Sequence, residues 1–270
     1  MTLYMIGLGL NDEKDISLKG LEAVKKCKTI YLEKYTSILH CDIKKLEELY
    51  GKKVIIADRD MVESKAEDTI LKDAEMDDTA FLVVGDVFGA TTHTDLMIRA
   101  KKDSIEVKVI NNASILNAVG ITGLELYKFG KTTSIVFPQE NWMPHTPYDV
   151  LRENQKMNLH TLCLLDIKVA EPSSEDLKKG INKIQKPRFM RINEAIDYMI
   201  DIEQMQGENI FTSETLCIGC ARLSSENPTI ISGKAKELIE TDFGEPLHCL
   251  IIPAKLHFIE EEALKFWKTL

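Results

Sequence analysis

Short apolar runs alternate with amphipathic stretches over the first part of the chain. Residues 3–7 are apolar and lead into residues 17–27, where Leu18, Leu21 and Val24 recur at the spacing of one helix face. The further predicted strands are residues 29–32, 53–57, 81–84 and 107–110, and the further predicted helices are residues 43–49, 63–78 and a segment through Arg99 and Ala100. Strands that alternate with helices indicate a parallel sheet with right-handed crossovers.

The pattern changes beyond Asn112, where strands no longer alternate strictly with helices. Strands are predicted at residues 134–137, 161–167, 215–221 and 248–252. A polar stretch near residues 171–188 carries Lys178, Lys179, Lys183, Lys186 and Arg188 and is expected to be solvated surface. We therefore predict an α/β protein of two α/β domains. Residues 1–113 form a parallel sheet with helices on both faces, and residues 114–270 form a mixed sheet with an insertion near residues 171–188.

Composition narrows the class of protein. The 270 residues are 44% hydrophobic, which is enough for two modest cores. The net charge is −9 and the basic residues are dispersed, so the electrostatic footprint of a nucleic-acid-binding protein is missing. No apolar run approaches the roughly 20 residues that span a bilayer, and the N-terminus lacks the basic region of a signal peptide. We expect a cytoplasmic protein without a membrane partner.

The six cysteines do not predict a disulfide framework, because most lie inside apolar patterns where cysteine acts as a small buried hydrophobe. Cys217 and Cys220 have the spacing of a metal or redox motif. No second such pair exists, and only His248 and Cys249 follow at a distance that could complete a zinc site. Two core positions on a strand are the favoured interpretation, and no metal is predicted.

Two glycine-rich turns are the main candidates for ligand binding. Gly7 and Gly9 follow the first strand, but Asp12 stands where the dinucleotide fingerprint has a third glycine, so a dinucleotide is disfavoured. Gly85 and Gly89 flank Asp86 after the most hydrophobic strand, where open parallel sheets bind ligands. This second turn either approaches a ligand or is a tight connection in which Asp86 caps a helix, and the residues alone weigh the two equally.

The segment of residues 141–149 combines aromatic, proline and imidazole groups. It either borders a substrate cleft or is a rigid surface loop with Trp142 packed on the core, and the second interpretation is favoured. Neither a nucleophile elbow nor a Walker lysine loop is present in the sequence.

Several long segments carry a specific family pattern. They read LYMIGLGLNDEKDISLKGLEAVKKC, YLEKYTSIL, GDVFGATTHTDLMIRAK, VINNASILNAVGITGLELYKFGKTTSIVFP, NWMPHTPYDVLRENQKMNLHTLCLLDIK, TLCIGCARLSSENPTI and DFGEPLHCLIIPAKLHFIE. Together they closely resemble the diphthine synthase family, which belongs to the tetrapyrrole-methylase-like enzymes that use S-adenosylmethionine. The resemblance runs nearly from end to end of the chain.

The resemblance implies a homodimer in which S-adenosylmethionine is held largely by backbone contacts from several loops. By position in the family pattern, the implied cofactor-binding residues are Leu10, Asp86, Gly89, Ser114, Ile115, Leu165, Leu223 and His248. Gly89 stands where an archaeal relative is expected to have a bulkier residue, and Leu223 where a smaller one is expected. Backbone contacts tolerate such changes.

The resemblance also implies a substrate, because enzymes of this family methylate the modified histidine of elongation factor 2. Eukaryotic members methylate both the amino group and the carboxylate to give diphthine methyl ester, whereas archaeal members stop at the trimethylated amine. Residues 168–190 resemble an insertion of the eukaryotic members and favour the four-methyl product. The alternatives are a methylase of a tetrapyrrole or precorrin, and a catalytically inactive protein that binds a translation factor.

Methyl transfer from a sulfonium is an in-line displacement, so alignment and exclusion of water are the enzyme's main tasks. The acceptor amine must be neutral to attack. His93, Asp166 and His248 could take its proton, but each also has a credible structural role, and no catalytic base is assigned from the sequence.

Overall fold

The computed structural model describes residues 1–139, 142–168 and 186–268. The chain divides into two compact units, Met1–Ala118 and Val119–Leu270, which we call unit 1 and unit 2. This division falls slightly later in the chain than the predicted boundary between residues 113 and 114. Most of the predicted insertion near residues 171–188 lies outside the described residues.

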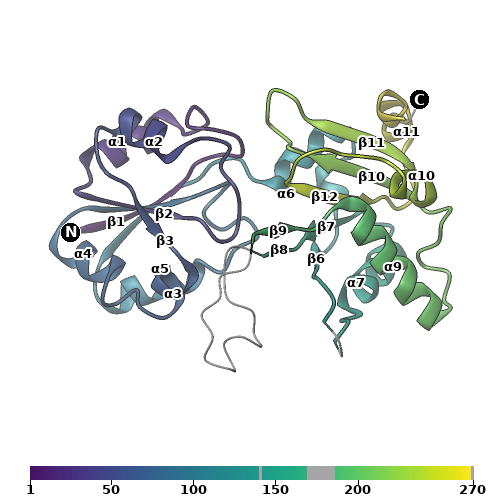
Figure 1. The fold of residues 1–270 in the computed structure, drawn as a ribbon, viewed down its shortest axis with the longest axis horizontal. Coiled ribbons are helices and arrows are strands. Elements are labelled where there is room, and N and C mark those ends of the chain that lie inside the picture. The colour runs from purple at the N-terminus through teal and green to yellow at the C-terminus, as the bar shows by residue number, and fades with distance from the viewer. Residues whose placement is uncertain (140–141, 169–185, 269–270) are drawn as a thin grey trace. The chain divides into compact units, whose positions relative to one another are not determined.

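Unit 1 is built on a five-stranded sheet whose strands are all parallel, in the order β3-β2-β4-β1-β5 (Figure 1). The strands are β1 (Thr2–Gly7), β2 (Thr29–Glu33), β3 (Ile55–Ala57), β4 (Thr79–Val83) and β5 (Glu106–Ile110). The helices are α1 (Leu18–Lys26), α2 (Ile43–Tyr50), α3 (Arg59–Glu63), α4 (Ile70–Met76), α5 (Thr94–Lys102) and α6 (Ile115–Ala118). The predicted parallel α/β architecture is confirmed.

Helices cover both faces of this sheet, which explains why its central strands are apolar at successive positions. Because side chains alternate along a strand, Met5 and Ile6 of β1 point to opposite faces, yet both are fully buried. Ile6 belongs to a core cluster with Val24 of α1 and Leu46 of α2. Figure 1 shows α1 and α2 on one face and α3, α4 and α5 on the other.

The chain connections diverge from the two neighbouring strands β1 and β4. After β1 the chain passes beyond β4 to reach β2, and after β4 it passes beyond β1 to reach β5. The two connections therefore leave in opposite directions along the sheet. In open parallel sheets such a switch point opens a crevice at the carboxyl ends of the strands, where ligands bind.

The prediction of a single exposed helix over residues 63–78 is wrong. The structure has two short helices, α3 and α4, and Thr69 at the start of α4 provides no side-chain cap. Ile70, Leu71 and Ala74 of α4 are buried against the sheet. These three apolar residues place one face of α4 in the core. The high overall charge of the segment led to the prediction that the helix is exposed.

Unit 2 has a mixed sheet in the order β11-β10-β12-β7-β6, in which only the β6–β7 pair is parallel (Figure 1). Its strands are β6 (Thr133–Ile135), β7 (Thr161–Leu165), β10 (Leu216–Ala221), β11 (Thr229–Lys234) and β12 (His248–Ile252), and β8 (Ile167–Lys168) and β9 (Arg188–Phe189) form a separate pair. Its helices are η1 (Val119–Thr122), η2 (Leu126–Lys128), α7 (Thr146–Lys156), α9 (Ile192–Gln206), α10 (Ala235–Ile239), α11 (Phe258–Leu264) and η3 (Lys265–Trp267). The predicted mixed sheet is confirmed.

One predicted strand of unit 2 is divided, and the strands β9 and β11 were not predicted. The strand expected over residues 161–167 ends at Leu165, because Asp166 turns toward the end of β6 and its carboxylate accepts a hydrogen bond from the Phe137 backbone N–H (2.9 Å). The longer of the two is β11, whose sequence TIISGK ends in glycine and lysine. Its buried positions are Ile230 and Ser232, and a serine at a buried position breaks the apolar alternation that identifies a strand.

The cysteine motif has no chelating geometry. Cys217 and Cys220 are three residues apart on β10, so they point to opposite faces of the sheet, and both are buried. Burial raises the pKa of Cys217 above its usual range. Across the described part of the chain we find no group of three potential metal ligands. Nor does any described helix combine the length and the apolar character needed to cross a bilayer.

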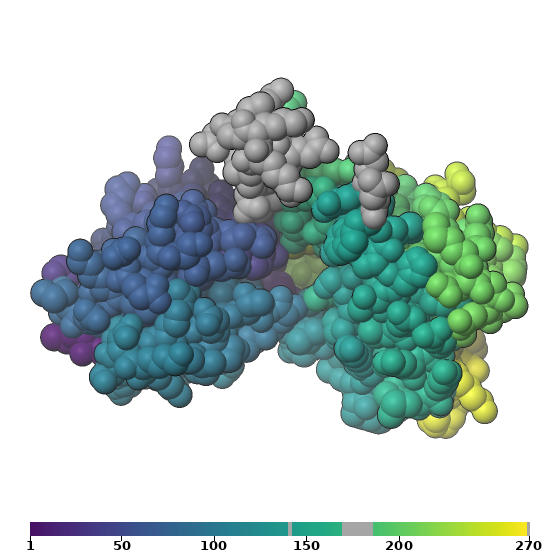
Figure 2. Space-filling view, turned by 90° about the horizontal axis from the view of Figure 1, so that it is seen from below, coloured from purple at the N-terminus to yellow at the C-terminus, as the bar shows by residue number. Residues whose placement is uncertain are grey.

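A buried carboxylate ties the C-terminal helices into unit 2. The C-terminal residues, yellow in Figure 2, lie at the surface of this unit, yet Glu260 of α11 is fully buried. Its oxygens accept hydrogen bonds from Lys128 Nζ (2.8 Å), His160 Nε2 (2.8 Å), Glu125 N (3.1 Å) and His257 N (2.8 Å). Burial alone would raise the pKa of Glu260, but these bonds outweigh it and lower the pKa to about 2.

Replacing this carboxylate should destabilise the protein in a pH-dependent way. Because the folded-state pKa lies below the usual value of 4.5, Glu260 stabilises the fold above pH 4.5, and this contribution is lost as the pH falls toward 2. We expect Glu260→Gln to lower the free energy of unfolding by about 3 kcal/mol at pH 7. Urea unfolding from pH 7 to pH 3 measures this effect.

The matched control is Glu262→Gln on the same helix, where the carboxylate is exposed and pairs only with Lys265. It should change the free energy of unfolding by less than about 1 kcal/mol. A constant difference between Glu260→Gln and the wild type from pH 7 to pH 3 would contradict the linkage argument.

Candidate functional site

The two glycine-rich turns are hydrogen-bonded to each other at the switch point of unit 1. Gly9 N donates to Gly85 O (3.2 Å) and Gly85 N donates to Gly9 O (2.7 Å), which forms a short bridge beyond the ends of β1 and β4. The turns were predicted separately, each from the strand before it. The structure brings them together because β1 and β4 are parallel neighbours.

Glycine is required in this bridge for two different reasons. Gly9 and Gly85 have φ values of +80° and +83°, a region that side chains rarely adopt. At Gly7 the limit is space, since an added Cβ would lie 2.6 Å from Gly85 O. Larger residues at these positions would separate the two turns.

Asp86 joins the second turn to the loop that follows β5. Its Oδ1 accepts a hydrogen bond from Phe88 N (3.0 Å), and its Oδ2 accepts from Asn112 N (3.0 Å) and from Asn111 Nδ2 (3.0 Å). Burial would raise the pKa of Asp86, but the hydrogen bonds together hold it below its usual value. Asp86 therefore remains a carboxylate acceptor. It does not cap α5, which begins at Thr94.

Two further side chains, which the sequence interpretation missed, hold the same loops. Asn112 Nδ2 donates to Gly7 O (3.0 Å) and to Asp15 O (3.0 Å), so it links the end of β5 to the first turn. Asp15 Oδ2 accepts from Leu10 N (3.1 Å) and Asn11 N (2.8 Å). The sequence signal for Asn112 was its position just beyond β5, whereas Asp15 lies in the loop before α1 and carried no such signal.

Five of the expected cofactor residues meet at this edge of unit 1. A Cβ added to Gly89 would lie 2.8 Å from Ser114 Cβ, so Gly89 packs directly on Ser114. Ile115 begins α6 at the next position. Leu10 lies close to Gly85. A Cβ added to Gly85 would lie 3.8 Å from Leu10 Cδ2, and no other atom would be nearer to it. Gly85 is itself buried, and the atoms nearest to an added Cβ lie at ordinary contact distance, so this turn packs against Leu10 with Asp86 beside it.

The other three expected cofactor residues meet at one edge of the sheet in unit 2. His248 is the first residue of β12 and pairs with Ala221, the last residue of β10. Because β12 runs antiparallel to β7 as well, its start lies beside Leu165 at the end of β7. Leu223 follows the end of β10 by two residues. All three side chains are buried, so a ligand here would meet mainly backbone.

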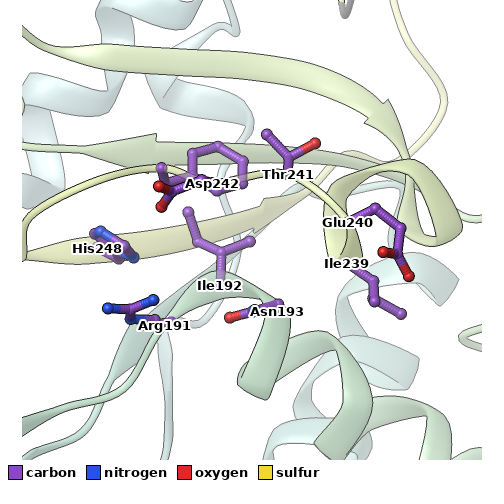
Figure 3. A pocket seen from close by; sticks show the side chains of 9 residues that line it. Arg191, Ile192, Asn193, Ile239, Glu240, Thr241, Asp242 and His248 are labelled. Carbon is purple, nitrogen blue, oxygen red and sulfur yellow. The ribbon is translucent and has the colours of Figure 1, made fainter.

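His248 is held as a neutral ring with one unused nitrogen. Its Nε2 lies 3.1 Å from both Gly244 O and Glu245 O, so Nε2 carries the proton and donates it. Burial lowers the pKa of His248, and although the two carbonyls act in the opposite direction, the net shift is downward. Nδ1 is then an acceptor, and it is buried without a hydrogen-bond partner among the described residues. His248 also lines a pocket of unit 2, drawn in Figure 3.

The other two residues considered as proton acceptors have structural roles. His93 is buried, its Nδ1 faces Val87 O (3.2 Å), and its ring packs edge-on against Phe81. Burial is the main cause that lowers the pKa of His93. Asp166 holds the end of β6 through Phe137 N. Both side chains thus make structural contacts, and His93 Nε2 is buried without a hydrogen-bond partner among the described residues.

The favoured interpretation of the loop near residues 141–149 is wrong in one respect. Trp142 is 52% exposed, so it does not pack on the core. Residue 141 lies outside the described residues. His145 Nδ1 is hydrogen-bonded to Gln206 Nε2 at the C-terminal end of α9 (2.7 Å). The loop is therefore attached to α9 by His145, while Trp142 faces solvent.

Comparison with known proteins assigns the whole chain to one family. The family model described as Tetrapyrrole (Corrin/Porphyrin) Methylases matches residues 2–239. The diphthine methyl ester synthase of Dictyostelium discoideum is 53% identical over 271 residues, covering 100% of this chain and 99% of the relative. The diphthine methyl ester synthase of Homo sapiens is 50% identical over 270 residues, covering 98% of this chain and 94% of the relative.

A solved structure supports the same family assignment as these sequence relatives. The crystal structure of a putative diphthine synthase from Entamoeba histolytica superimposes with a TM-score of 0.89 at 46% sequence identity, covering 100% of this chain and 99% of that chain. The paired glycine turns of unit 1 and the mixed sheet of unit 2 therefore belong to a known architecture. The chain belongs to the tetrapyrrole (corrin/porphyrin) methylase family and, within it, to the diphthine synthase branch.

Proposed function

We propose that this protein is an S-adenosylmethionine-dependent methyltransferase that methylates the modified histidine of elongation factor 2 and gives diphthine methyl ester. The observation that carries the proposal is about 50% identity over nearly the full chain to relatives named diphthine methyl ester synthase. The bridge between the two glycine turns at the switch point supports a small-molecule site in unit 1. The homodimer expected from the resemblance and the cytoplasmic location expected from the sequence composition stay predictions.

The residues present fit the proposed cofactor. In unit 1 the backbone of the paired turns lies beside the Asp86 carboxylate, and in unit 2 the Nδ1 of His248 is a buried acceptor without a partner among the described residues. The proposed contacts come from Leu10, Asp86, Gly89, Ser114 and Ile115 in unit 1, and from Leu165, Leu223 and His248 in unit 2. When bound, S-adenosylmethionine supplies an electrophilic methyl group on a sulfonium.

The protein's own contribution is alignment, because methyl transfer to an amine needs the nucleophile in line with the leaving group. Asp86 and Asn112 keep the two turns of unit 1 in fixed positions through hydrogen bonds. Each attack on the way to the trimethylated amine requires the amine to have lost a proton first, and we assign no residue to this step.

Two other functions remain distinguishable by experiment. A tetrapyrrole or precorrin methylase would share the family model and the glycine turns. It would change the absorbance of a corrinoid precursor on mixing with S-adenosylmethionine. A catalytically inactive translation-factor binding protein would bind the factor without transferring methyl groups. The names of the full-length relatives favour the diphthine reaction over both.

Removing the Asp86 carboxylate should weaken cofactor binding. Asp86→Ala deletes three hydrogen bonds that hold the second turn to the loop after β5, so the proposed cofactor contacts of Asp86, Gly89 and Ser114 would lose their alignment. We expect S-adenosylmethionine affinity to fall by about tenfold or more, as for the loss of charge-assisted hydrogen bonds. Isothermal titration calorimetry measures this change. Asp201→Ala, on the exposed side of α9, should leave the affinity unchanged, and equal affinities for both variants would count against the site.

The reaction itself can be tested by mass spectrometry of elongation factor 2 that carries the unmethylated modified histidine. After incubation with this protein and S-adenosylmethionine, we expect four added methyl groups, one of which is labile to mild base because it is an ester. Three stable methyl groups would indicate that the reaction stops at the amine. No change in mass, with cofactor binding demonstrated separately, would refute the proposed substrate.

A further inference from the structure

A small polar pocket lies at the N-terminal end of α9 in unit 2. Its volume is about 180 Å³, and it is lined by Arg191, Ile192, Asn193, Ile239, Glu240, Thr241, Asp242, Phe243 and His248 (Figure 3). Pockets that enclose drug-sized ligands have volumes of roughly 300–1,000 Å³. This pocket is therefore suited to a small polar group. His248 is also an expected cofactor residue, so a ligand here would adjoin the proposed cofactor site.

The pocket presents charges of both signs without internal pairing. The exposed Arg191 guanidinium makes no ion pair or hydrogen bond with any described residue, although ion pairs occur elsewhere on α9. Asp242 Oδ1 accepts from Gly244 N (2.9 Å), which leaves Oδ2 without a protein donor in the described structure. Figure 3 shows Arg191 on one side of the His248 ring and Asp242 on the other. The pocket thus combines a free cation and a free carboxylate oxygen beside the neutral ring of His248.

We propose that this pocket binds an α-amino-acid head group, namely the amino group and the carboxylate of the modified histidine that accepts the methyl groups. In this arrangement the planar fork of Arg191 binds the carboxylate, and Asp242 binds the ammonium form of the amine before it is deprotonated. The inference rests on the proposed function, which supplies an acceptor with both groups. Arg191 and Asp242 then determine the specificity for that acceptor.

Ligands of a single charge fit the pocket less well. A phosphate or simple carboxylate would be attracted by Arg191 but would face the carboxylates of Asp242 and Glu240. A simple cation would face Arg191. A zwitterion satisfies both sides. The methionine half of S-adenosylmethionine has the same chemistry, so the experiment must separate the acceptor from the cofactor.

The test compares Arg191→Gln, Arg191→Lys and Asp242→Asn with the wild type in the full-length protein. Asparagine still accepts the hydrogen bond from Gly244 N, so Asp242→Asn removes charge while keeping the turn. Three quantities are measured: the KM for elongation factor 2 carrying the modified histidine, the Kd of that factor for the protein with S-adenosylhomocysteine, and the Kd for S-adenosylmethionine. Lys72→Gln, an exposed residue of α4, is the control for loss of one positive charge.

We expect Arg191→Gln to raise the KM and the Kd for the factor about tenfold or more, with S-adenosylmethionine affinity within twofold of the wild type. Arg191→Lys should recover part of the loss, because lysine keeps the charge but not the planar fork. Asp242→Asn should also weaken factor binding, and Lys72→Gln should match the wild type.

Two results would overturn the inference. Unchanged factor binding in all three pocket variants would show that the pocket does not hold the acceptor. A loss of S-adenosylmethionine affinity as large as the loss of factor affinity would place the cofactor's own amino-acid group there instead. A wild-type protein that binds the factor without methylating it would refute the proposed function, while the comparison of Kd values would still decide the role of the pocket.

Discussion

The reciprocal hydrogen bonds between Gly9 and Gly85 are the contact on which the site in unit 1 depends. The two strands before these turns are neighbours in a parallel sheet, and the chain leaves them in opposite directions. Without the bridge, the backbone groups of two diverging loops would lack partners, which is costly where they are shielded from water. The bridge forms only where both residues adopt positive φ, and Gly7 leaves room for Gly85 O. Asp86 and Asn112 then attach the loop after β5 to the pair.

The strand pattern and the two turns of unit 1 were predictable from local sequence, because buried parallel strands are apolar runs and positive-φ turns favour glycine. The pairing of the turns was not predictable, since it follows from the order of strands in the sheet. Asn112 and Asp15 could not be recognised for the same reason: Asn112 contacts Gly7, which is more than one hundred positions away in sequence. The charged segment of α3 and α4 was wrongly predicted to be one exposed helix, because its buried face consists of only a few apolar residues.

The edge of unit 2 depends even more on topology. Leu165 ends β7, Leu223 follows β10 and His248 begins β12, and the order β10-β12-β7 with antiparallel neighbours brings those strand ends together. No periodicity in the sequence indicates this order. Family resemblance identified the three positions, and the sheet explains physically why they belong together. Because the three side chains are buried, a ligand at this edge would meet mainly the backbone.

At the same edge, the charges of Arg191 and Asp242 lie on different sides of the His248 ring (Figure 3). The carbonyls of Gly244 and Glu245 fix the proton of His248 on Nε2, and burial keeps the ring neutral. Arg191 stands just before the 15-residue helix α9, whose N-terminal N–H groups add positive potential on that side. Asp242 provides negative charge on the other side (Figure 3). In the proposed binding mode, a zwitterion would enter in one orientation, with its carboxylate toward Arg191 and α9 and its ammonium toward Asp242.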